Sequence, residues 1–190
     1  MVVHAHPCDE SFSAALFGRT VETLGARGWQ VDSCSLYQEQ FQPVLSAAER
    51  RGYHDMDGNT GPVQAYVDRV TAAEALVLVF PVWNFGYPAI LKGFLDRVFL
   101  PGVSFVLDGG RVRGNLRSIR RLAAVTTYGG DRLRATLVGD PPRRSVMRHL
   151  RAVTHPRARA RYLALYDMNR ADADRRAAFL SRVERSMERL

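Results

Sequence analysis

The sequence predicts a doubly wound α/β fold, a three-layer sandwich around a five-stranded parallel sheet, formed as a single domain by residues 1–190. Short apolar runs alternate with segments of helical periodicity, which is typical of consecutive βαβ units. The run Ala75–Phe80 is wholly apolar, as expected of a central parallel strand buried on both faces. With 190 residues, 46% of them apolar, the chain is long enough to bury a core without disulfides or a structural metal.

The first half of the chain supplies two strands and a helix. Val2–Ala5 reads as the first strand and Trp29–Leu36 as the second. Between them, Ser11 is suited to cap a helix that ends near Gly28. The apolar side of this helix recurs at spacings of three and four residues, at Phe12, Ala15, Leu16, Thr20 and Leu24.

A long polar segment precedes the central strand. Tyr37–Gly61 has no firm periodicity, so we expect a functional loop with some helical turns. Pro62 then begins a helix that leads to the Ala75–Phe80 strand, which we expect to end at Pro81.

The second half continues the alternation and adds one excursion. Gly102–Gly114 is expected to form a small hairpin or a bulged excursion. The other elements expected in order are a helix at Ala89–Phe99, a strand at Leu122–Thr126, a helix at Ser145–Val153, a strand at Arg161–Tyr166 and a final amphipathic helix at Ala171–Leu190. The residues expected to face inward from that last helix are Ala177, Leu180, Val183 and Met187.

Composition narrows the classes of function. No apolar run approaches the roughly 20 residues that span a bilayer, and the first residues do not resemble a signal peptide, so a soluble cytoplasmic protein is expected. Cys8 and Cys34 are expected to be free thiols, and no metal site is predicted. The net charge of +8 reflects arginine used throughout the chain, which makes nucleic-acid binding the least favoured reading. One arginine-rich run, Arg143–Arg161, contains no acidic residue and could attract a nucleotide phosphate.

Ligands of doubly wound sheets bind at the carboxyl ends of the strands, and three loops there have unusual sequences. The first, His6–Ser13, offers hydroxyls and free amides at a helix N-terminus, where a phosphate fits, although an ordinary serine cap explains it almost as well. The second, Phe80–Pro88, places three aromatic residues after the central strand, either for a flat heteroaromatic ligand or to cover the sheet edge or a dimer contact. The third, Thr126–Asp131, has hydroxyls and two glycines, and a plain Gly-Gly turn is its alternative reading.

Together these loops resemble the flavodoxin-like NAD(P)H:quinone oxidoreductase family, which includes DT-diaphorase, modulators of drug activity and ancillary subunits of potassium efflux systems. The resemblance covers about residues 1–131. Its motifs are Ala5-His6-Pro7 with Ser11-Phe12, the block from Phe80-Pro81 through Pro88 to Phe99, and Thr126-Thr127 with Gly129-Gly130. Relatives usually have several residues before the first strand, so we expect that strand to be weakened here.

The resemblance implies noncovalent flavin, FMN or alternatively FAD, and hydride transfer from NADPH or NADH to a quinone by a ping-pong mechanism. The flavin-binding residues that it implies are His6, Ser11, Phe12, Ser13, Ala15, Pro81, Val82, Trp83, Asn84, Phe85, Thr126, Thr127, Tyr128, Gly129 and Gly130. Tyr128 is the candidate catalytic residue, since it either replaces the family's ring-facing tyrosine or shifts the loop. His149 and His155 match the family's histidine by residue type only, and Lys92 reads as a family helix residue.

The resemblance also implies a homodimer, with an interface supplied by the residues near Trp83 and by the Tyr37–Gly61 loop. The arginine-rich run favours NADPH through its extra phosphate. Two other functions remain open. The same fold could reduce azo, nitro or free flavin acceptors, or the chain could be a flavin-binding regulatory subunit that docks on a membrane transporter.

Overall fold

A computed structural model describes all of residues 1–190, and its centre is a five-stranded parallel sheet in the order β2-β1-β3-β6-β7. The strands are β1 (Val2–His4), β2 (Ser33–Ser35), β3 (Ala75–Val82), β6 (Arg121–Tyr128) and β7 (Arg159–Leu165). The predicted parallel sheet is therefore confirmed. From β1 the chain first moves outward to β2 and then crosses back to β3 on the other side, so the direction of winding reverses between β1 and β3.

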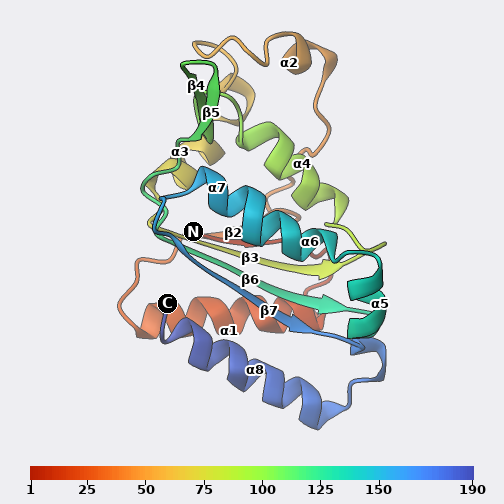
Figure 1. Cartoon of the computed structure of the whole chain (residues 1–190). Helices are drawn as coiled ribbons and strands as arrows, with labels where there is room; N and C mark the ends of the chain where they lie inside the picture. Colours follow the sequence, from red (N-terminus) through yellow and green to blue (C-terminus); the bar gives the residue numbers. More distant parts are fainter.

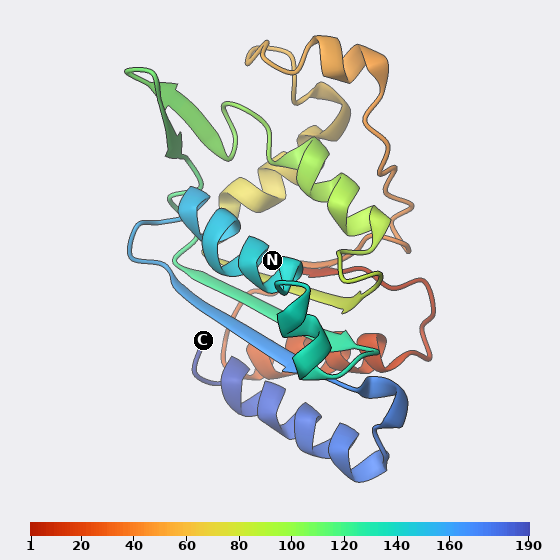
Figure 2. The same ribbon diagram turned by 45° about the vertical axis from the view of Figure 1, so that its right-hand side comes forward.

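Helices cover both faces of the sheet, which makes three layers (Figure 1). One face carries α1 (Phe12–Ala26) and α8 (Ala173–Met187), which pack side by side. The other carries α3 (Gln64–Ala72), α4 (Ala89–Val98) and a continuous helix made of α6 (Pro141–Arg144), the π-helical η2 (Ser145–Leu150) and α7 (Arg151–Val153), as Figure 2 also shows. The remaining elements are α2 (Ala47–Arg51), η1 (Gly61–Val63), β4 (Phe105–Asp108), β5 (Arg111–Gly114), α5 (Arg132–Leu137) and η3 (Met168–Arg170). None of the helices is both long and apolar enough to cross a membrane.

Two apolar cores lie on the two faces of the sheet. Along β3, Leu76, Leu78 and Phe80 belong to the core beneath α3 and α4. Val77 and Val79 alternate with them and belong to the core shared with α1 and α8. Each of these buried side chains contributes about 2 kcal/mol to folding, which explains why the central strand is apolar without interruption.

The two central strands extend further than predicted. β3 does not end at Pro81 but continues to Val82, and β6 continues past Thr126 to Tyr128, with Val82 and Tyr128 as register partners. Val77 and Val79 direct their backbone groups to the β1 side, so Pro81 faces that side too, beyond the point where β1 stops pairing. Pro81 is tolerated because no ladder hydrogen bond is needed from its nitrogen.

Two other sequence predictions are corrected. The second strand was predicted at Trp29–Leu36 but comprises only Ser33–Ser35, because only these three residues pair with β1. On α8, Ala177 is exposed and Phe179 is buried in its place. Phe179, Val183 and Met187 are spaced by four residues, so they form one stripe against the sheet.

Two excursions project beyond α3 and α4, at the top of Figure 1. The predicted hairpin is confirmed as β4 and β5, with Gly109 and Gly110 at positive φ in its turn. The segment between β2 and α3 contains the expected helical turn, α2. It is anchored by the buried Arg97 of α4, whose Nε donates to Glu49 at 2.8 Å.

Candidate active site at the carboxyl edge of the sheet

Because the five strands are parallel, their carboxyl ends share one edge, and the loops after β1, β3 and β6 meet there. The rings of His6 and Trp83 lie 5.7 Å apart, so the first two loops are in contact. The non-glycine residues with positive φ all lie in segments that follow the carboxyl ends of strands: Gln40, Asn84, Phe85, Asp140 and Asp167. Strain of this kind costs about 1–3 kcal/mol per residue and concentrates at functional sites.

The first loop leads into the N-terminus of α1, as predicted. Ser11 is the N-cap, and its hydroxyl oxygen accepts from the Ala14 amide at 3.1 Å. The amides of Phe12 and Ser13 make no hydrogen bond within the chain, and no acidic residue stands in the first turn. The helix dipole and these two donors therefore favour an anion at this position.

Two histidines, His4 and His6, contact residues of this loop. The buried His4 stacks on Phe17 and lies 3.3 Å from the hydroxyl of Ser13, so Ser13 turns its side chain toward the sheet. Burial, with a contribution from nearby His6, lowers the pKa of His4 to about 4. His6 accepts a hydrogen bond at Nδ1 from the Cys8 amide at 3.0 Å, which fixes the loop and leaves Nε2 as a possible donor.

The second loop is a tight turn in which strain and exposure coincide. Trp83 and Gly86 exchange backbone hydrogen bonds of 3.2 and 2.8 Å across it. The two central residues, Asn84 and Phe85, have φ values of 48° and 56°, as in a type I′ turn. Asparagine adopts this region more readily than most residues, whereas for phenylalanine it is a rare and strained conformation. The Asn84 and Phe85 amides are unpaired, and the side chains of Trp83 and Phe85 are 41% and 38% exposed.

Tyr87, the third aromatic residue of this loop, is oriented differently. Its ring packs edge-on against Phe80 at 5.1 Å, and its hydroxyl donates to the Pro142 carbonyl at 3.3 Å. Burial raises the pKa of Tyr87 to about 12. Tyr87 thus covers the sheet edge, whereas Trp83 and Phe85 are available to a ligand.

The third loop begins at Gly129, because Thr126, Thr127 and Tyr128 belong to β6 and are buried. The amides of Gly129 and Gly130 make no hydrogen bond within the chain. The hydroxyl of Thr126 is also buried without a partner. Unsatisfied buried polar groups are rare, and the two free glycine amides beside it are donors that a ligand can reach.

Sequence reasoning missed the residues that support this third loop. Asp140, Tyr162 and Tyr166 surround the hydroxyl and ring of Tyr128. A signal for the two tyrosines was present, because Tyr162 and Tyr166 are four residues apart within the predicted strand Arg161–Tyr166, and an even spacing puts them on one face. Asp140 was not identifiable, since it is separated from Tyr128 by the whole of α5.

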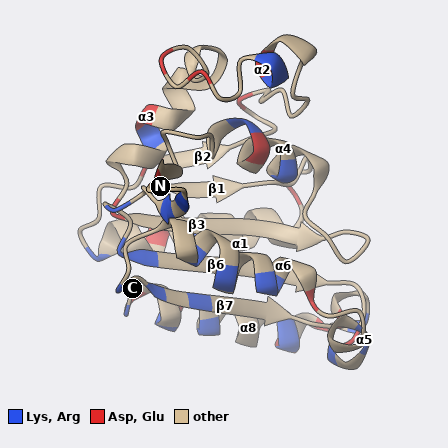
Figure 3. Ribbon diagram, turned by 45° about the horizontal axis from the view of Figure 1, so that its top comes forward, with Lys and Arg blue, Asp and Glu red and all other residues tan.

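Other candidates are not brought to the three loops. His155 lies before β7, where its amide bonds to Ile119, at the amino edge. The exposed His149 lines a hollow of about 220 Å³ with Lys92, whose ammonium group pairs with Asp96 at 2.6 Å. The Arg143–Arg161 run is spread out rather than gathered at one patch: Arg161 donates to carbonyls at the end of α8, and basic segments extend along β7 and α8 (Figure 3).

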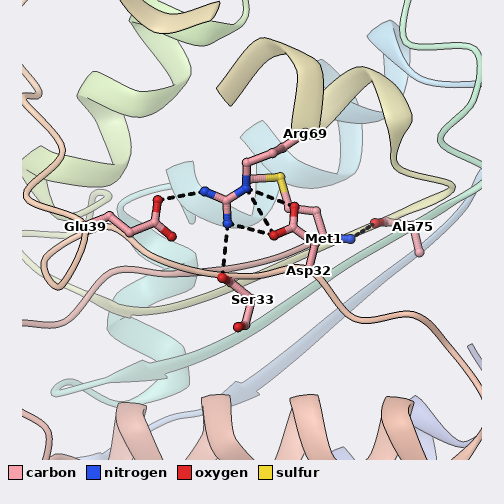
Figure 4. Close-up of polar contacts among 6 residues, drawn as sticks. All are labelled: Met1, Asp32, Ser33, Glu39, Arg69 and Ala75. Atoms are coloured by element: carbon pink, nitrogen blue, oxygen red, sulfur yellow. Dashed lines mark hydrogen bonds and ion pairs between the residues drawn. The ribbon is translucent and has the colours of Figure 1, made fainter. Parts of the chain in front are cut away.

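A hollow of about 850 Å³ lies at the opposite, amino edge of the sheet, between Trp29 and Arg69. Arg69, Asp32 and the amino group of Met1 are already hydrogen-bonded there (Figure 4). Arg69 donates to Asp32 at 2.7 Å and to Glu39 at 2.7 Å, and the amino group of Met1 donates to the Ala75 carbonyl at 3.0 Å. The amides of Gln30, Val31 and Asp32 also have no partner there, but they belong to a single segment, whereas the carboxyl edge gathers unpaired amides from three loops.

Comparison with known proteins places these observations in a family. An uncharacterized NAD(P)H oxidoreductase of Escherichia coli, YcaK, is 32% identical over 132 residues, which cover 69% of this chain and 64% of that protein. NAD(P)H dehydrogenase (quinone) 1 of Cavia porcellus is 29% identical over 147 residues, covering 69% of this chain and 54% of that protein. The chain thus spans less than two thirds of the length of these curated relatives.

Solved structures agree over nearly the whole chain. Smu.1420 from Streptococcus mutans superposes with a TM-score of 0.83 at 26% identity, covering 100% of this chain and 98% of that one. An NAD(P)H:quinone oxidoreductase from Methanothermobacter marburgensis gives 0.83 at 23% identity, over 98% and 95% of the two chains. An FMN-dependent NADH-azoreductase from Bacillus anthracis, in complex with FMN, gives 0.77 at 16% identity, over 99% and 96%. The last two likenesses concern the fold alone.

The family assignment rests on the sequence as a whole. Residues 1–187 match the family whose description is a flavodoxin-like fold, and the predicted five-stranded parallel sheet is present. The chain therefore belongs to the family of proteins with a flavodoxin-like fold.

Proposed function

We propose that this chain binds FMN noncovalently at its carboxyl edge and acts as an NAD(P)H dehydrogenase that reduces a quinone. The observation that carries the proposal is the set of unpaired backbone donors that three loops bring to one edge. These are the amides of Phe12, Ser13, Asn84, Phe85, Gly129 and Gly130. Donors that the chain leaves without partners are suited to a ligand rich in acceptors.

The residues of this edge fit the separate parts of a flavin mononucleotide. The N-terminus of α1, with the Ser11 hydroxyl free to donate its proton, suits a phosphate. The exposed rings of Trp83 and Phe85 suit a flat heteroaromatic ring, and the amides of Asn84 and Phe85 suit acceptor atoms at its edge. A bound flavin supplies reversible two-electron chemistry, which none of these side chains supplies.

The names of the relatives support the choice of substrates. YcaK is named an NAD(P)H oxidoreductase and the Cavia porcellus relative a quinone dehydrogenase. Both substrates would use the same open face beside the Trp83 turn, which predicts ping-pong kinetics. FMN is preferred over FAD because an FMN complex exists among the structures of this fold. NADPH is preferred over NADH, with Arg143, whose guanidinium lies 5.5 Å from the centre of the Tyr162 ring, as the proposed contact for the extra phosphate.

An azo compound is the second candidate acceptor. The exposed, aromatic turn at Trp83 offers a flat surface that does not distinguish a quinone from another planar acceptor. An azoreductase is also among the structures with the same fold. Relative kcat/KM values for a benzoquinone and an azo dye, measured with the same reductant, would decide between the two classes.

The protein is further proposed to be a cytoplasmic homodimer. Large exposed apolar side chains occur at Trp83 and Phe85, on the segment after β2 at Val44 and Met56, and on the hairpin at Leu107. Covering such residues is a common reason for association through a two-fold interface. Light scattering coupled to size-exclusion chromatography tests this, and a monomer at micromolar concentration would contradict it.

The central experiment is the visible spectrum of the purified protein, followed by chromatography of any released flavin. A yellow protein that NADPH bleaches without oxygen, and that a quinone then recolours, is the expected result. A colourless protein that fails to bind added FMN or FAD would overturn the proposal.

Replacing Trp83 with alanine tests where the ring lies. Loss of one aromatic contact is expected to raise the dissociation constant for FMN by about 2- to 10-fold. The matched control is Trp29→Ala, because Trp29 is the other tryptophan and lies at the amino edge. Equal FMN affinity in the two folded variants would contradict the placement.

A further inference from the structure

Three phenols and one carboxylate form a partly buried network behind the third loop. The hydroxyl of Tyr128 donates to Oδ1 of Asp140, and the hydroxyl of Tyr166 donates to Oδ2 at 3.2 Å. The hydroxyls of Tyr128 and Tyr162 lie 2.6 Å apart, and the rings of Tyr128 and Tyr166 pack at 4.6 Å. The network joins the ends of β6 and β7 to the residue that precedes α6.

The direction of each hydrogen bond follows from proton counting. A phenol carries one proton, and that of Tyr128 goes to Asp140, so Tyr162 must donate to the oxygen of Tyr128. Burial, first of all, raises the pKa of Tyr128, Tyr162 and Tyr166, and the Asp140 carboxylate adds to each. The phenols therefore remain protonated. Tyr128 and Tyr166 donate to the Asp140 carboxylate directly, and Tyr162 donates to Tyr128.

Asp140 has a backbone conformation that is unfavourable for a residue other than glycine. Its φ and ψ are 45° and 62°, in the left-handed region, and the preceding Gly139 has φ of 86°. A non-glycine residue in this region costs about as much as one hydrogen bond contributes, so the surroundings must hold it there. Backbone bonds from the Asp140 amide to Ala135 at 2.8 Å and from the Arg144 amide to Asp140 at 3.0 Å contribute to this, and the phenols of Tyr128 and Tyr166 add the side-chain partners.

The segment between Tyr128 and Asp140 has few other anchors. α5 is only six residues long, too short to be stable alone. Leu133, Leu137 and Val138 are 69%, 77% and 49% exposed, and Ala135 is the buried apolar residue of this segment. The hydrogen bond between Tyr128 and Asp140 joins the two residues at the ends of this segment.

We infer that Asp140 is a positioning residue that holds residues 129–140 against the site. Asp140 fixes the end of this segment to Tyr128 and Tyr166, while β6 and the bond from the Asp167 amide to the Gly130 carbonyl at 2.8 Å fix its start, where Gly129 and Gly130 present their amides. The part of this inference that concerns the ligand rests on the proposed function. The part that concerns the segment holds for the flavin-free protein as well, so the two can fail separately.

Trypsin cleavage of flavin-free protein tests the first part. Arg132 and Arg134 lie exposed on α5 and are ready cleavage sites once the segment opens. Losing the charge-assisted bonds in Asp140→Ala is expected to speed cleavage there by about tenfold or more, with little change in the midpoint of global unfolding. Asp140→Asn retains one acceptor oxygen and is expected to fall between the alanine variant and the parent.

The matched control is Asp167→Asn. Asp167 lies on the same edge, also at positive φ, and its carboxylate contacts only Arg170, at 4.0 Å. This variant is expected to be cleaved at the parental rate. If Asp140→Ala fails to fold, Tyr166→Phe removes one bond to Asp140 and is expected to speed cleavage by a smaller factor.

FMN titration of the same variants tests the second part. The dissociation constant is expected to rise by about tenfold in Asp140→Ala and to recover partly in Asp140→Asn. Cleavage of Asp140→Ala, or of Tyr166→Phe where the former does not fold, at the parental rate would overturn the inference. So would faster cleavage with unchanged FMN affinity, because the segment would then not serve the site. If the parent itself binds no FMN, the proposed function fails, and the proteolysis result still decides whether Asp140 holds the segment.

Discussion

The strained turn after β3 allows a test in which the sign of a stability change reports backbone strain. Phe85 has φ of 56°, and its side chain is 38% exposed. We compare Phe85→Ala with Phe85→Gly. Both variants remove the ring, so the lost packing is common to them, and their difference isolates the cost of holding a Cβ in the left-handed region.

The expected difference follows from two opposing quantities. A left-handed conformation costs an L-residue about 1–2 kcal/mol, and glycine avoids this cost. Glycine loses about 0.5–1 kcal/mol more conformational entropy on folding than alanine. The glycine variant should therefore be more stable than the alanine variant by about 0.5–1 kcal/mol. At an ordinary position the order is reversed.

Urea unfolding of the flavin-free variants measures this difference. With unchanged m values, the unfolding midpoint of Phe85→Gly should lie above that of Phe85→Ala. In thermal unfolding the gap corresponds to about 1–4 °C for a chain of this length. Both variants should also bind FMN more weakly than the parent, by similar factors. An alanine variant as stable as the glycine variant, or more stable, would refute the strain, and with it the view that this turn is held for a ligand.

Two further predictions concern stability. Folding lowers the pKa of His4 from 6.5 to about 4, so as the pH falls the unfolded chain takes up a proton before the folded chain does. The neutral His4 therefore contributes at most about 3 kcal/mol to stability above pH 6.5, and this contribution is lost as the pH falls toward 4. His4→Gln can still bond Ser13 but does not titrate, so its unfolding midpoint should depend less on pH over this range, and an identical pH dependence would contradict the assignment. Gly93→Ala would place Cβ 2.2 Å from the Pro43 carbonyl oxygen and should destabilise the protein by about 1–3 kcal/mol, measured by urea unfolding. Gly18→Ala on the open side of α1 has no atom within 4 Å and should instead stabilise it by about 0.5–1 kcal/mol, and equal effects at the two glycines would contradict the close packing at Pro43.

The sheet could be predicted because its strands are buried on both faces. Ala75–Phe80 has no polar residue, and this is enough to locate a central strand without any knowledge of its neighbours. The end of a strand is different, because it depends on which neighbour is present. Pro81 stops a strand only where its nitrogen would face a partner, and here β1 has already ended. That information belongs to the register between strands and not to the residues on either side of the proline.

The candidate site divides in the same way. Ser11 could be identified because a helix cap acts within three residues of itself, and the Trp83–Gly86 turn could be expected to be strained from its own sequence. Asp140 could not be found, because its partner Tyr128 is twelve residues away across α5. A local pattern carries no information about a contact that forms only when β6, β7 and α5 have come together.

The two edges of the sheet differ in how their polar groups are hydrogen-bonded, which the volume of a hollow does not measure. At the amino edge, where the larger hollow lies, Arg69 bonds Asp32 and Glu39, so a ligand that used these charged groups would have to break existing pairs. At the carboxyl edge the donors of three loops have no partner in the chain, and Phe85 is held in a strained conformation that contributes nothing to folding. Binding free energy is gained where the protein has left groups both fixed and unpaired. The unpaired amides of three loops and the strained turn therefore favour the carboxyl edge as the candidate site, although the larger hollow lies at the other edge.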